Sequence, residues 1–285
     1  MSQIVAIIQA RLTSTRLPGK VLRDIAGKPM LDWVVERTHR SKLIDQVVVA
    51  TTLDPADDKL FDFCENRGYL VKRGDVHDVL DRYYRIAKEL HATIIVRITA
   101  DCPFIDPLLI DRAVGFLRGN QKVTNFKGIS PDGTFDFVAN RLPPPWGRSY
   151  PIGLDIETFY FERLVEAWQK AVERYQREHV TPYFYEDASV DELRFSEANI
   201  PLAQTITPKG YKILLMHHSS DCGQLRWTVD THEDLEVARL IADHFDRMDF
   251  TWQEIYSFVQ KNPKLSQLNA HILHKTHLDV DQRNK

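Results

Sequence analysis

The first 120 residues alternate short apolar runs with longer segments in which apolar residues recur at helical spacing. Strands are predicted at Ile4–Ile8, Gln46–Thr51, Tyr69–Lys72 and Thr93–Ile98. The segments between them, "PMLDWVVERTHR", "PADDKLFDFCENRG" and "VHDVLDRYYRIAKEL", are predicted to be helices. Because strands and helices alternate at this spacing, right-handed crossovers should join parallel strands, with helices on both faces of the sheet. The sequence therefore predicts an α/β fold with a mainly parallel central sheet.

The pattern changes after about residue 120. The stretches "GISPDGTFDF" and "RLPPPWGRSYPIG" are rich in Gly and Pro, which predicts turns between shorter, antiparallel strands. Helical spacing returns at Glu162–Arg177, Glu233–Phe245 and Thr251–Gln260. The second half of the chain is therefore expected to depart from the regular alternation of the first.

Composition limits the class of protein. Hydrophobic residues make up 43% of the chain and charged residues 27%, which is typical of a globular protein, and the net charge of −3 argues against nucleic acid or a membrane surface as a partner. The three cysteines are widely spaced and form no CxxC pair, which disfavours a disulfide framework or a zinc ribbon. With no signal-peptide pattern and no apolar run that approaches the length of a membrane span, we expect a cytoplasmic protein.

A basic loop follows the first predicted strand. Residues 9–20 read "QARLTSTRLPGK". In open α/β sheets, ligands bind outside the carboxyl ends of the strands, which is where this loop begins. Arg11, Arg16 and Lys20 combine guanidinium groups with an ammonium, a mixture that suits a polyphosphate. Ser14 and Val21 stand where the standard phosphate-binding loop needs Gly and Ser or Thr. A solvated basic loop therefore remains the alternative.

Two aspartates are predicted to follow strands. Asp101 ends the apolar run in "IIVRITADCPFIDPLLID", and Asp230 follows the predicted strand Arg226–Val229. Thr231 and Asp234 have the spacing of a helix cap, which leaves Asp230 available for another role. Mg²⁺ typically takes one or two protein carboxylates and completes its coordination with phosphate oxygens and water. The alternative for Asp101 is an ordinary cap or turn residue.

These stretches resemble a known family. "AIIQARLTSTRLPGKVL", "GKPMLDWVVER", "DVLDRYYRIAKEL", "VRITADCPFIDP", "YPIGLDIETF", "REHVTPYFYE" and "RWTVDTHEDL" occur in the family's order between about residues 3 and 247. The chain resembles the cytidylyltransferases that make CMP-activated sugar acids, such as the CMP-acylneuraminate and CMP-KDO synthetases. It is most similar to the spore-coat polysaccharide biosynthesis cytidylyltransferase-like family.

The resemblance implies a GT-A-like, three-layer α/β fold of the nucleotide-diphospho-sugar transferase type. It implies a nucleotidyltransferase domain at 1–250, with a nucleotide-binding half at 1–120 and an acceptor half at 121–250. Outside the resemblance, the sequence pattern itself predicts a C-terminal helix and a tail at residues 251–285. Related synthetases are commonly homodimers, and a homodimer is expected here.

The resemblance also implies a set of site residues. The magnesium ligands, with Mn²⁺ as a substitute, would be Asp101 and Asp230, and these two would be catalytic together with Arg11 and Lys20. CTP would be bound by Gln9, Ala10, Arg11, Ser14, Arg16, Lys20 and Asp101. Two departures from the better-known synthetases are Gln9 in place of Pro and Ala100 in place of Gly.

The chemistry that the resemblance implies is an in-line displacement. A hydroxyl of the acceptor attacks the α-phosphorus of CTP and pyrophosphate leaves, while positive charge and metal stabilise the developing negative charge. The product would be a CMP-sugar for surface polysaccharide or glycan biosynthesis. Candidate acceptor-binding residues are Asp155, Glu157, His179 and Arg226. A buried ion pair or a helix-end position is the alternative role for each of these four.

Two other functions remain open. A GT-A glycosyltransferase would use the same fold but usually carries a D-x-D pair, where this chain has Asp101-Cys102-Pro103. A non-catalytic nucleotide-binding protein would leave both aspartates and the basic loop without a role. The sequence does not name the acceptor, and a phosphorylated or phosphonate acceptor is an alternative to a sugar acid.

Overall fold

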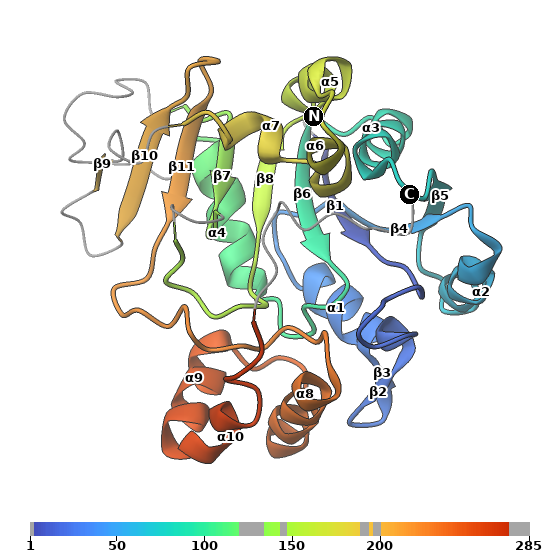
Figure 1. The fold of residues 1–285 in the computed structure, drawn as a ribbon, viewed down its shortest axis with the longest axis vertical. Coiled ribbons are helices and arrows are strands. Elements are labelled where there is room, and N and C mark those ends of the chain that lie inside the picture. The colour runs from blue at the N-terminus through green and yellow to red at the C-terminus, as the bar shows by residue number, and fades with distance from the viewer. Residues whose placement is uncertain (1–2, 120–133, 143–146, 189–193, 196–200, 274–285) are drawn as a thin grey trace.

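One mixed sheet forms the centre of the molecule. The computed structural model describes residues 3–119, 134–142, 147–188, 194–195 and 201–273. Within these ranges, nine strands form a sheet of order β5-β4-β1-β6-β8-β7-β11-β10-β9 (Figure 1). Its strands are β1 (Ile4–Gln9), β4 (Gln46–Thr52), β5 (Val71–Gly74), β6 (Ile94–Thr99), β7 (Phe137–Ala139), β8 (Glu157–Tyr160), β9 (Arg194–Phe195), β10 (Leu202–Ile206) and β11 (Lys212–Met216). A separate hairpin joins β2 (Asp24–Ile25) to β3 (Lys28–Pro29).

Most strands of this sheet run in one direction. The strands β5, β4, β1 and β6 pair in parallel, and β8 and β10 run antiparallel to their neighbours. Because β8 is antiparallel to both β6 and β7, β7 runs in the direction of β6, and β11 pairs with β7 in parallel. Because β10 is antiparallel to both β11 and β9, β9 runs in this direction too. Seven of the nine strands of this sheet, within the described residues, therefore point the same way. This confirms the predicted α/β fold with a mainly parallel sheet, and β8 and β10 are the antiparallel strands that the Gly- and Pro-rich second half predicted.

Helices cover both faces of the sheet. Successive side chains of a buried strand therefore enter two different hydrophobic cores. Along β1, Ile4, Ala6 and Ile8 join one cluster of buried side chains, whereas Val5 and Ile7 join the other. The first core contains side chains of α1 (Met30–His39), α2 (Asp58–Asn66), α4 (Pro107–Leu117), α8 (His232–Phe245) and α9 (Trp252–Lys261). The second contains side chains of α3 (Val79–Glu89), α5 (Phe161–Lys170) and α7 (Pro182–Tyr185), with α6 (Arg174–His179) packed against α3.

The C-terminal helices lie beyond the carboxyl ends of the strands. Figure 1 shows α8, α9 and the short α10 (Pro263–Gln267) below the arrowheads of β6 and β11. The N-cap of α8 is Thr231, with Asp234 completing the predicted capping box. In the described residues, no helix is both long and apolar enough to span a lipid bilayer. All three cysteines fall within these residues, are buried and form no disulfide, as expected.

The predicted helix Glu162–Arg177 is interrupted. The helix α5 ends at Lys170 and α6 begins at Arg174, because the Gln176 side chain accepts hydrogen bonds from the backbone N–H groups of Val172 and Glu173, both at 3.0 Å. These bonds form a new helix start where the apolar spacing alone predicted continuity.

The predicted strand Arg226–Val229 was wrong. This segment makes an isolated bridge to Ile152, and its backbone N–H groups are directed to loops. The N–H groups of Trp227 and Thr228 donate to Ile152 O at 2.7 and 3.1 Å. Gly153 allows this close approach, because a Cβ there would lie 2.5 Å from Thr228 N, and its φ is +104°. The segment belongs to no strand of the sheet, and the chain bends at Thr228.

Candidate active site

The basic loop folds back to direct Lys20 into the molecule. Leu12 N donates to the buried Asp57 carboxylate at 2.6 Å, and Gly19 N donates to Leu12 O at 2.9 Å. Gly19 adopts the left-handed conformation, with φ of +68°, at the start of a 3-10 turn over Lys20–Leu22. Lys20 is consequently 9% exposed, although it belongs to a loop.

The Lys20 ammonium joins the two aspartates predicted from the sequence. Its Nζ lies 2.8 Å from Asp101 Oδ2, 2.8 Å from Asp230 Oδ1 and 3.0 Å from Val229 O. An ammonium has three N–H donors, so these contacts use all of them. The basic loop and these two carboxylates therefore form one cluster, which we call the lysine–aspartate cluster.

Backbone hydrogen bonds bring the two aspartates together. Asp101 follows β6, and its carbonyl oxygen accepts from Val229 N at 2.8 Å and from Thr228 Oγ1 at 3.0 Å. Asp230 comes next in the chain, immediately before the Thr231 cap of α8. The irregular segment that replaces the predicted strand thus determines where Asp230 lies relative to Asp101.

The electrostatics of the cluster keep both partners charged. Burial by itself would raise the pKa of Asp101, but the charge and hydrogen bond of Lys20, with contacts from Thr99 and Cys102, lower it to about 2. For Lys20, burial acts to lower the pKa, and the charges of Asp101 and Asp230 outweigh it and raise the pKa. At neutral pH Lys20 is therefore an ammonium and Asp101 a carboxylate.

Arginines surround Asp230 on its other side. Asp230 Oδ2 lies 2.9 Å from Arg16 Nη2 and 2.8 Å from Arg226 Nη2. Arg226 also binds Asp234 through two contacts of 2.8 and 2.9 Å, and it is 4% exposed. Asn269 Nδ2 donates to Asp234 Oδ1 at 2.9 Å. Arg226, a candidate acceptor residue from the sequence, therefore lies in the buried support of Asp230.

The other predicted nucleotide-binding residues lie at the start of the same loop. The Gln9 carbonyl accepts from Ala100 N, and Ala10 N donates to Ala50 O, both at 3.1 Å, so these two residues are held between β4 and β6. Arg11 and Ser14 are half-buried in the loop. These positions lie at the carboxyl ends of parallel strands, together with Arg16 and Lys20.

Two acidic candidates for acceptor binding lie in a second group. Asp155 is held by Arg148 through two contacts of 2.8 and 3.0 Å, with Arg141 at 3.9 Å. Glu157, which is 4% exposed, accepts from Arg97 at 2.9 Å and from Thr181 at 2.9 Å. We call these residues the arginine–acid group: Arg97, Arg141, Arg148, Asp155 and Glu157. His179, the remaining candidate, is the half-buried last residue of α6.

The two groups are neighbours. Burial, then the charges of Asp101 and Asp155, raise the pKa of the Cys102 thiol, so both carboxylates lie near it. Sequence reasoning missed the three arginines of the arginine–acid group. Arg97 gave a signal, because it is a charged residue inside the otherwise apolar run "IIVRIT". Arg141 and Arg148 gave none beyond their position around a proline-rich turn.

The residues present suit a hard cation that shares its coordination with a nucleotide. Asp101 Oδ2 and Asp230 Oδ1 contact the same Lys20 Nζ, so both can face one ligand, and carboxylate oxygens are what Mg²⁺ prefers. In the described part of the chain, no group of three or more His, Cys, Asp or Glu side chains could hold a metal by itself. Phosphate oxygens and water would therefore complete the coordination.

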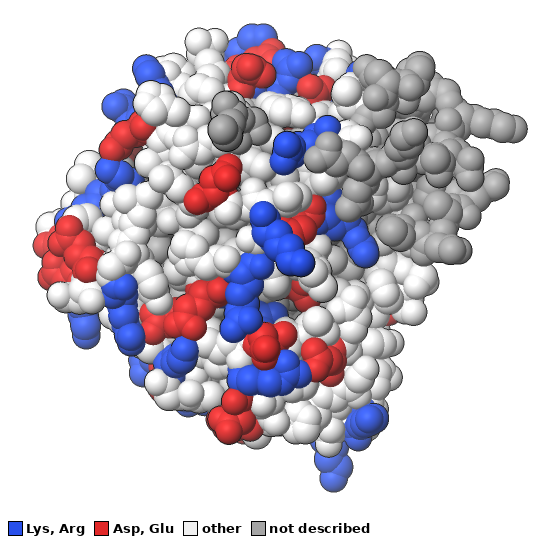
Figure 2. Space-filling model, turned by 180° about the vertical axis from the view of Figure 1, so that it is seen from behind, with Lys and Arg blue, Asp and Glu red and all other residues white. Residues whose placement is uncertain are grey.

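Charged side chains of both signs are mixed on one face of the molecule. On the face seen in Figure 2, acidic and basic side chains are interspersed and form no continuous basic area among the described residues.

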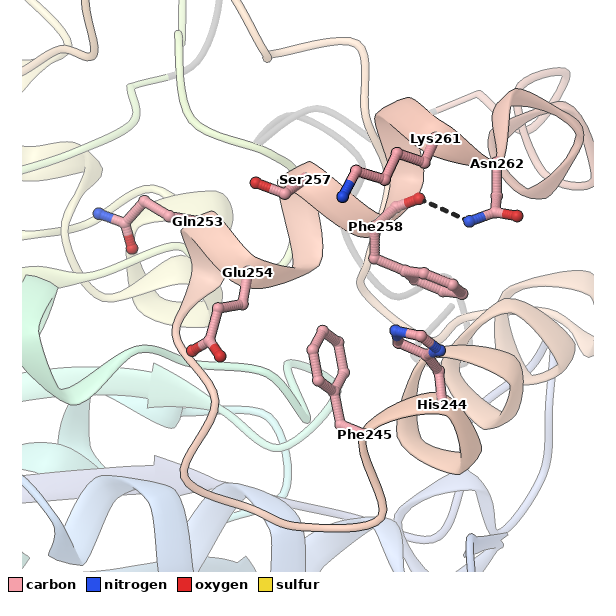
Figure 3. Close-up of a pocket in the computed structure, with 8 residues that line it drawn as sticks. All are labelled: His244, Phe245, Gln253, Glu254, Ser257, Phe258, Lys261 and Asn262. Atoms are coloured by element: carbon pink, nitrogen blue, oxygen red, sulfur yellow. Dashed lines mark hydrogen bonds between the residues drawn. The ribbon is translucent and has the colours of Figure 1, made fainter.

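A groove of about 580 Å³ lies between the end of α8 and α9 (Figure 3), where the rings of His244 and Phe258 stack with their centroids 3.8 Å apart. It is lined by His244, Phe245, Gln253, Glu254, Ser257, Phe258, Lys261 and Asn262, and by no predicted site residue.

Comparison of the sequence with known families shows that the chain is a nucleotidyltransferase and gives its family. The sequence model of the family described as cytidylyltransferase matches residues 5–236, so the chain belongs to the cytidylyltransferase family. This confirms the resemblance found in the sequence and favours a nucleotidyltransferase over a glycosyltransferase.

Relatives of similar length extend this result. The chain is 32% identical to an uncharacterized protein of Methanocaldococcus jannaschii, covering 98% of this chain and 100% of that protein. It is 30% identical to the spore coat polysaccharide biosynthesis protein SpsF of Bacillus subtilis, covering 92% and 96%. It is 43% identical to a 3-deoxy-manno-octulosonate cytidylyltransferase of Geobacter sulfurreducens, over 42% of this chain and 47% of that enzyme.

A solved structure agrees with the fold. The structure of a cytidylyltransferase from Leptospira borgpetersenii superposes with a TM-score of 0.78 at 30% identity, covering 96% of this chain and 100% of that one. The α/β fold of the nucleotide-diphospho-sugar transferase type is thus shared with known cytidylyltransferases.

Proposed function

We propose that the protein transfers the cytidylyl group of CTP to a hydroxyl of a sugar acid and releases pyrophosphate. The observation that carries the proposal is the lysine–aspartate cluster, in which a buried ammonium from the basic loop meets Asp101, which follows β6, and Asp230, which precedes α8. Positive charge from Lys20 and Arg16, together with Arg11 on the same loop, suits the triphosphate of a nucleotide.

The chain's residues would act by holding charge and geometry. Arg11, Arg16 and Lys20 bind the triphosphate, and Ser14 adds a hydroxyl donor. Asp101 and Asp230 would hold Mg²⁺ or Mn²⁺, which supplies positive charge next to the phosphate oxygens. The acceptor oxygen forms a bond to the α-phosphorus as the bond to pyrophosphate breaks, and the hydroxyl proton is released. No covalent intermediate with the protein is required.

The arginine–acid group favours an anionic acceptor. Its three arginines outnumber its two acids, Asp155 and Glu157, and the charge of Asp155 acts on Cys102, the residue after Asp101. Guanidinium groups bind carboxylates bidentately, so a sugar acid fits this charge. The partial match to a 3-deoxy-manno-octulosonate cytidylyltransferase supports the same substrate class.

The wider context of the reaction is also part of the proposal. The match to a spore coat polysaccharide biosynthesis protein supports a role in making surface polysaccharide or another glycan. We propose a cytoplasmic homodimer with CTP and a small sugar acid as its substrates. A phosphonate or phosphorylated acceptor would use the same arginines and is the second candidate.

A pyrophosphate-release screen tests the proposal. CTP, UTP, ATP and GTP are each combined with 3-deoxy-manno-octulosonate, N-acetylneuraminate, a sugar phosphate and a phosphonate, in the presence of Mg²⁺. We expect release with CTP and a sugar acid. Release with CTP and the phosphorylated or phosphonate acceptor would replace the sugar acid by the second candidate, and release with UTP and a sugar phosphate would contradict the cytidylyl assignment.

A further inference from the structure

The lysine–aspartate cluster is already balanced in charge without a metal ion. Among the described side chains of the cluster and its support, three cations face three carboxylates: Lys20, Arg16 and Arg226 against Asp101, Asp230 and Asp234. Their formal charges sum to zero. A divalent cation added to this arrangement would bring two positive charges into a neutral and largely buried site.

Lys20 and a divalent metal ion would compete for the same carboxylate oxygens. Its Nζ is 2.8 Å from Asp101 Oδ2 and 2.8 Å from Asp230 Oδ1, so it occupies the place between the two carboxylates where a shared cation would bind. An ammonium and a magnesium ion cannot both occupy that place, since both are positive and both need the same oxygens. Lys20 must leave the carboxylates before a metal ion can bridge them.

A triphosphate supplies the reason for Lys20 to leave. Lys20 belongs to the basic loop, and a lysine side chain is a flexible point charge that can move from one anion to another. Nucleotide phosphates beside the loop would compete with the carboxylates for the ammonium. When Lys20 turns to the phosphates, the two carboxylates lose a cation and become a site for a divalent ion.

We propose that Lys20 is an internal counter-ion that excludes divalent metal from Asp101 and Asp230 until a nucleoside triphosphate draws the ammonium away. Metal therefore binds with the nucleotide rather than before it. This inference rests on the proposed function, because it takes Asp101 and Asp230 to be metal ligands. It concerns the order of binding, which the activity alone does not determine.

The test measures metal binding to the full-length protein without turnover. Mn²⁺ binding is followed by electron paramagnetic resonance in wild type and in Lys20→Met, which removes the charge but keeps an unbranched apolar stem. Without nucleotide, we expect Lys20→Met to bind Mn²⁺ at least about tenfold more tightly than wild type. Lys28→Met is the matched control, because it removes one lysine charge from an exposed pair with Glu36 and should leave Mn²⁺ affinity unchanged.

The outcomes separate this inference from the proposed function. If Lys20→Met binds Mn²⁺ no more tightly than wild type, while wild type with CTP does bind Mn²⁺, the counter-ion role is wrong and the metal site stands. If Mn²⁺ binds neither wild type nor Lys20→Met, even with CTP, the proposed metal site is wrong and the proposed function is wrong with it. The double variant Lys20→Met/Asp101→Asn should lose the added affinity if Asp101 is a ligand.

A measurement on wild type alone covers the case in which Lys20→Met does not fold. Crystals of wild type are soaked in Mn²⁺ alone or in Mn²⁺ with CTP, and Mn²⁺ is located by anomalous scattering. We expect Mn²⁺ between Asp101 and Asp230 only when CTP is present, with Lys20 Nζ moved to the phosphates. Mn²⁺ between the carboxylates without CTP would overturn the inference.

Discussion

The lysine–aspartate cluster and the arginine–acid group neutralise their carboxylates in different ways. In the first, one ammonium is shared by Asp101 and Asp230, and Arg16 and Arg226 also bind Asp230. In the second, each acid has its own arginine at short distance, Arg148 for Asp155 and Arg97 for Glu157. A shared ammonium leaves carboxylates that can accept another cation when it moves. Individually paired acids are held in place, so they position the arginines around them.

The largest effect is expected from the aspartates of the lysine–aspartate cluster. Asp101→Asn should lower turnover by at least about a hundredfold, about 2.7 kcal/mol in the barrier, because the amide is a poor ligand for Mg²⁺. Asp230→Asn should lower turnover similarly. Steady-state kinetics across a magnesium titration measures both, with the exposed Asp62→Asn on α2 as the control. Wild-type turnover in either variant would remove that aspartate from the metal site.

The same two variants should differ in stability. Asp230 is bound by Lys20, Arg16 and Arg226, whereas Asp101 is bound by Lys20 and its side chain is 25% exposed. Removing the Asp230 charge leaves buried cations without compensation, which should cost about 1–3 kcal/mol. Urea denaturation should show the larger loss for Asp230→Asn, and equal losses would mean that the arginines do not depend on Asp230.

Glu157→Gln tests whether the arginine–acid group is held by its ion pairs. The change leaves Arg97, whose side chain is 12% exposed, beside a neutral amide, so the free energy of unfolding should fall by about 2 kcal/mol. Glu166→Gln removes an acid from a surface pair with Lys170 and should change stability by less than about 0.5 kcal/mol. If Glu157→Gln is as stable as wild type but binds the acceptor poorly, Glu157 contacts the substrate instead.

Arg141 should contribute to acceptor binding. Its Nε lies 3.9 Å from Asp155 Oδ2, whereas Arg148 Nη1 lies 2.8 Å from Asp155 Oδ1, so Arg141 is bound less tightly to Asp155 than Arg148 is. Arg141→Ala should raise the KM for the sugar acid by about tenfold, or about 1.4 kcal/mol, and leave the KM for CTP unchanged. Arg85→Ala, in an exposed pair with Asp81, is the control. An equal rise in both KM values would place Arg141 with the nucleotide.

The smallest effect concerns acid stability. Asp101 has its pKa lowered to about 2 in the folded protein, so its contribution to stability is complete above the ordinary pKa of 3.8 and is lost as the pH falls toward 2. Because solvent reaches part of the side chain, we expect a contribution of about 1 kcal/mol. Between pH 4 and 2, wild type should therefore lose about 1 kcal/mol more than Asp101→Asn in urea denaturation. Parallel losses would show that Lys20 does not lower this pKa.

Local patterns in the sequence predicted the regular half of the fold and the nucleotide side of the site. The strands β1, β4 and β6 lie on mainly apolar runs, and Asp101 comes two residues after the end of β6, so its place at the carboxyl end could be predicted. The strand β5 was predicted two residues early, because Tyr69 and Leu70 extend its apolar run while the ladder to β4 begins at Val71.

Tertiary contacts determined the rest. Asp230 was predicted to follow a strand, yet it is positioned by Val229 N and Thr228 Oγ1 on the Asp101 carbonyl, a contact that no local pattern reveals. Arg226 was predicted to meet an anionic acceptor, and its partner Asp234 was recognised only as part of a helix cap. A buried arginine can bind any acid that the fold brings near, so its partner could not be read from spacing.

Asn269 determines how much of the chain a chimeric protein needs in order to keep the lysine–aspartate cluster intact. Its side chain is 2% exposed and donates to Asp234 Oδ1 and to the Arg226 carbonyl at 3.0 Å, although it lies well beyond the family match that ends at residue 236. A fragment cut at residue 250 would retain every residue proposed to contact substrate and lose this brace. We expect that Asp230 would be misplaced in a chimera carrying only residues 1–250. A chimera carrying residues 1–273 would keep Asn269, and we expect it to be active.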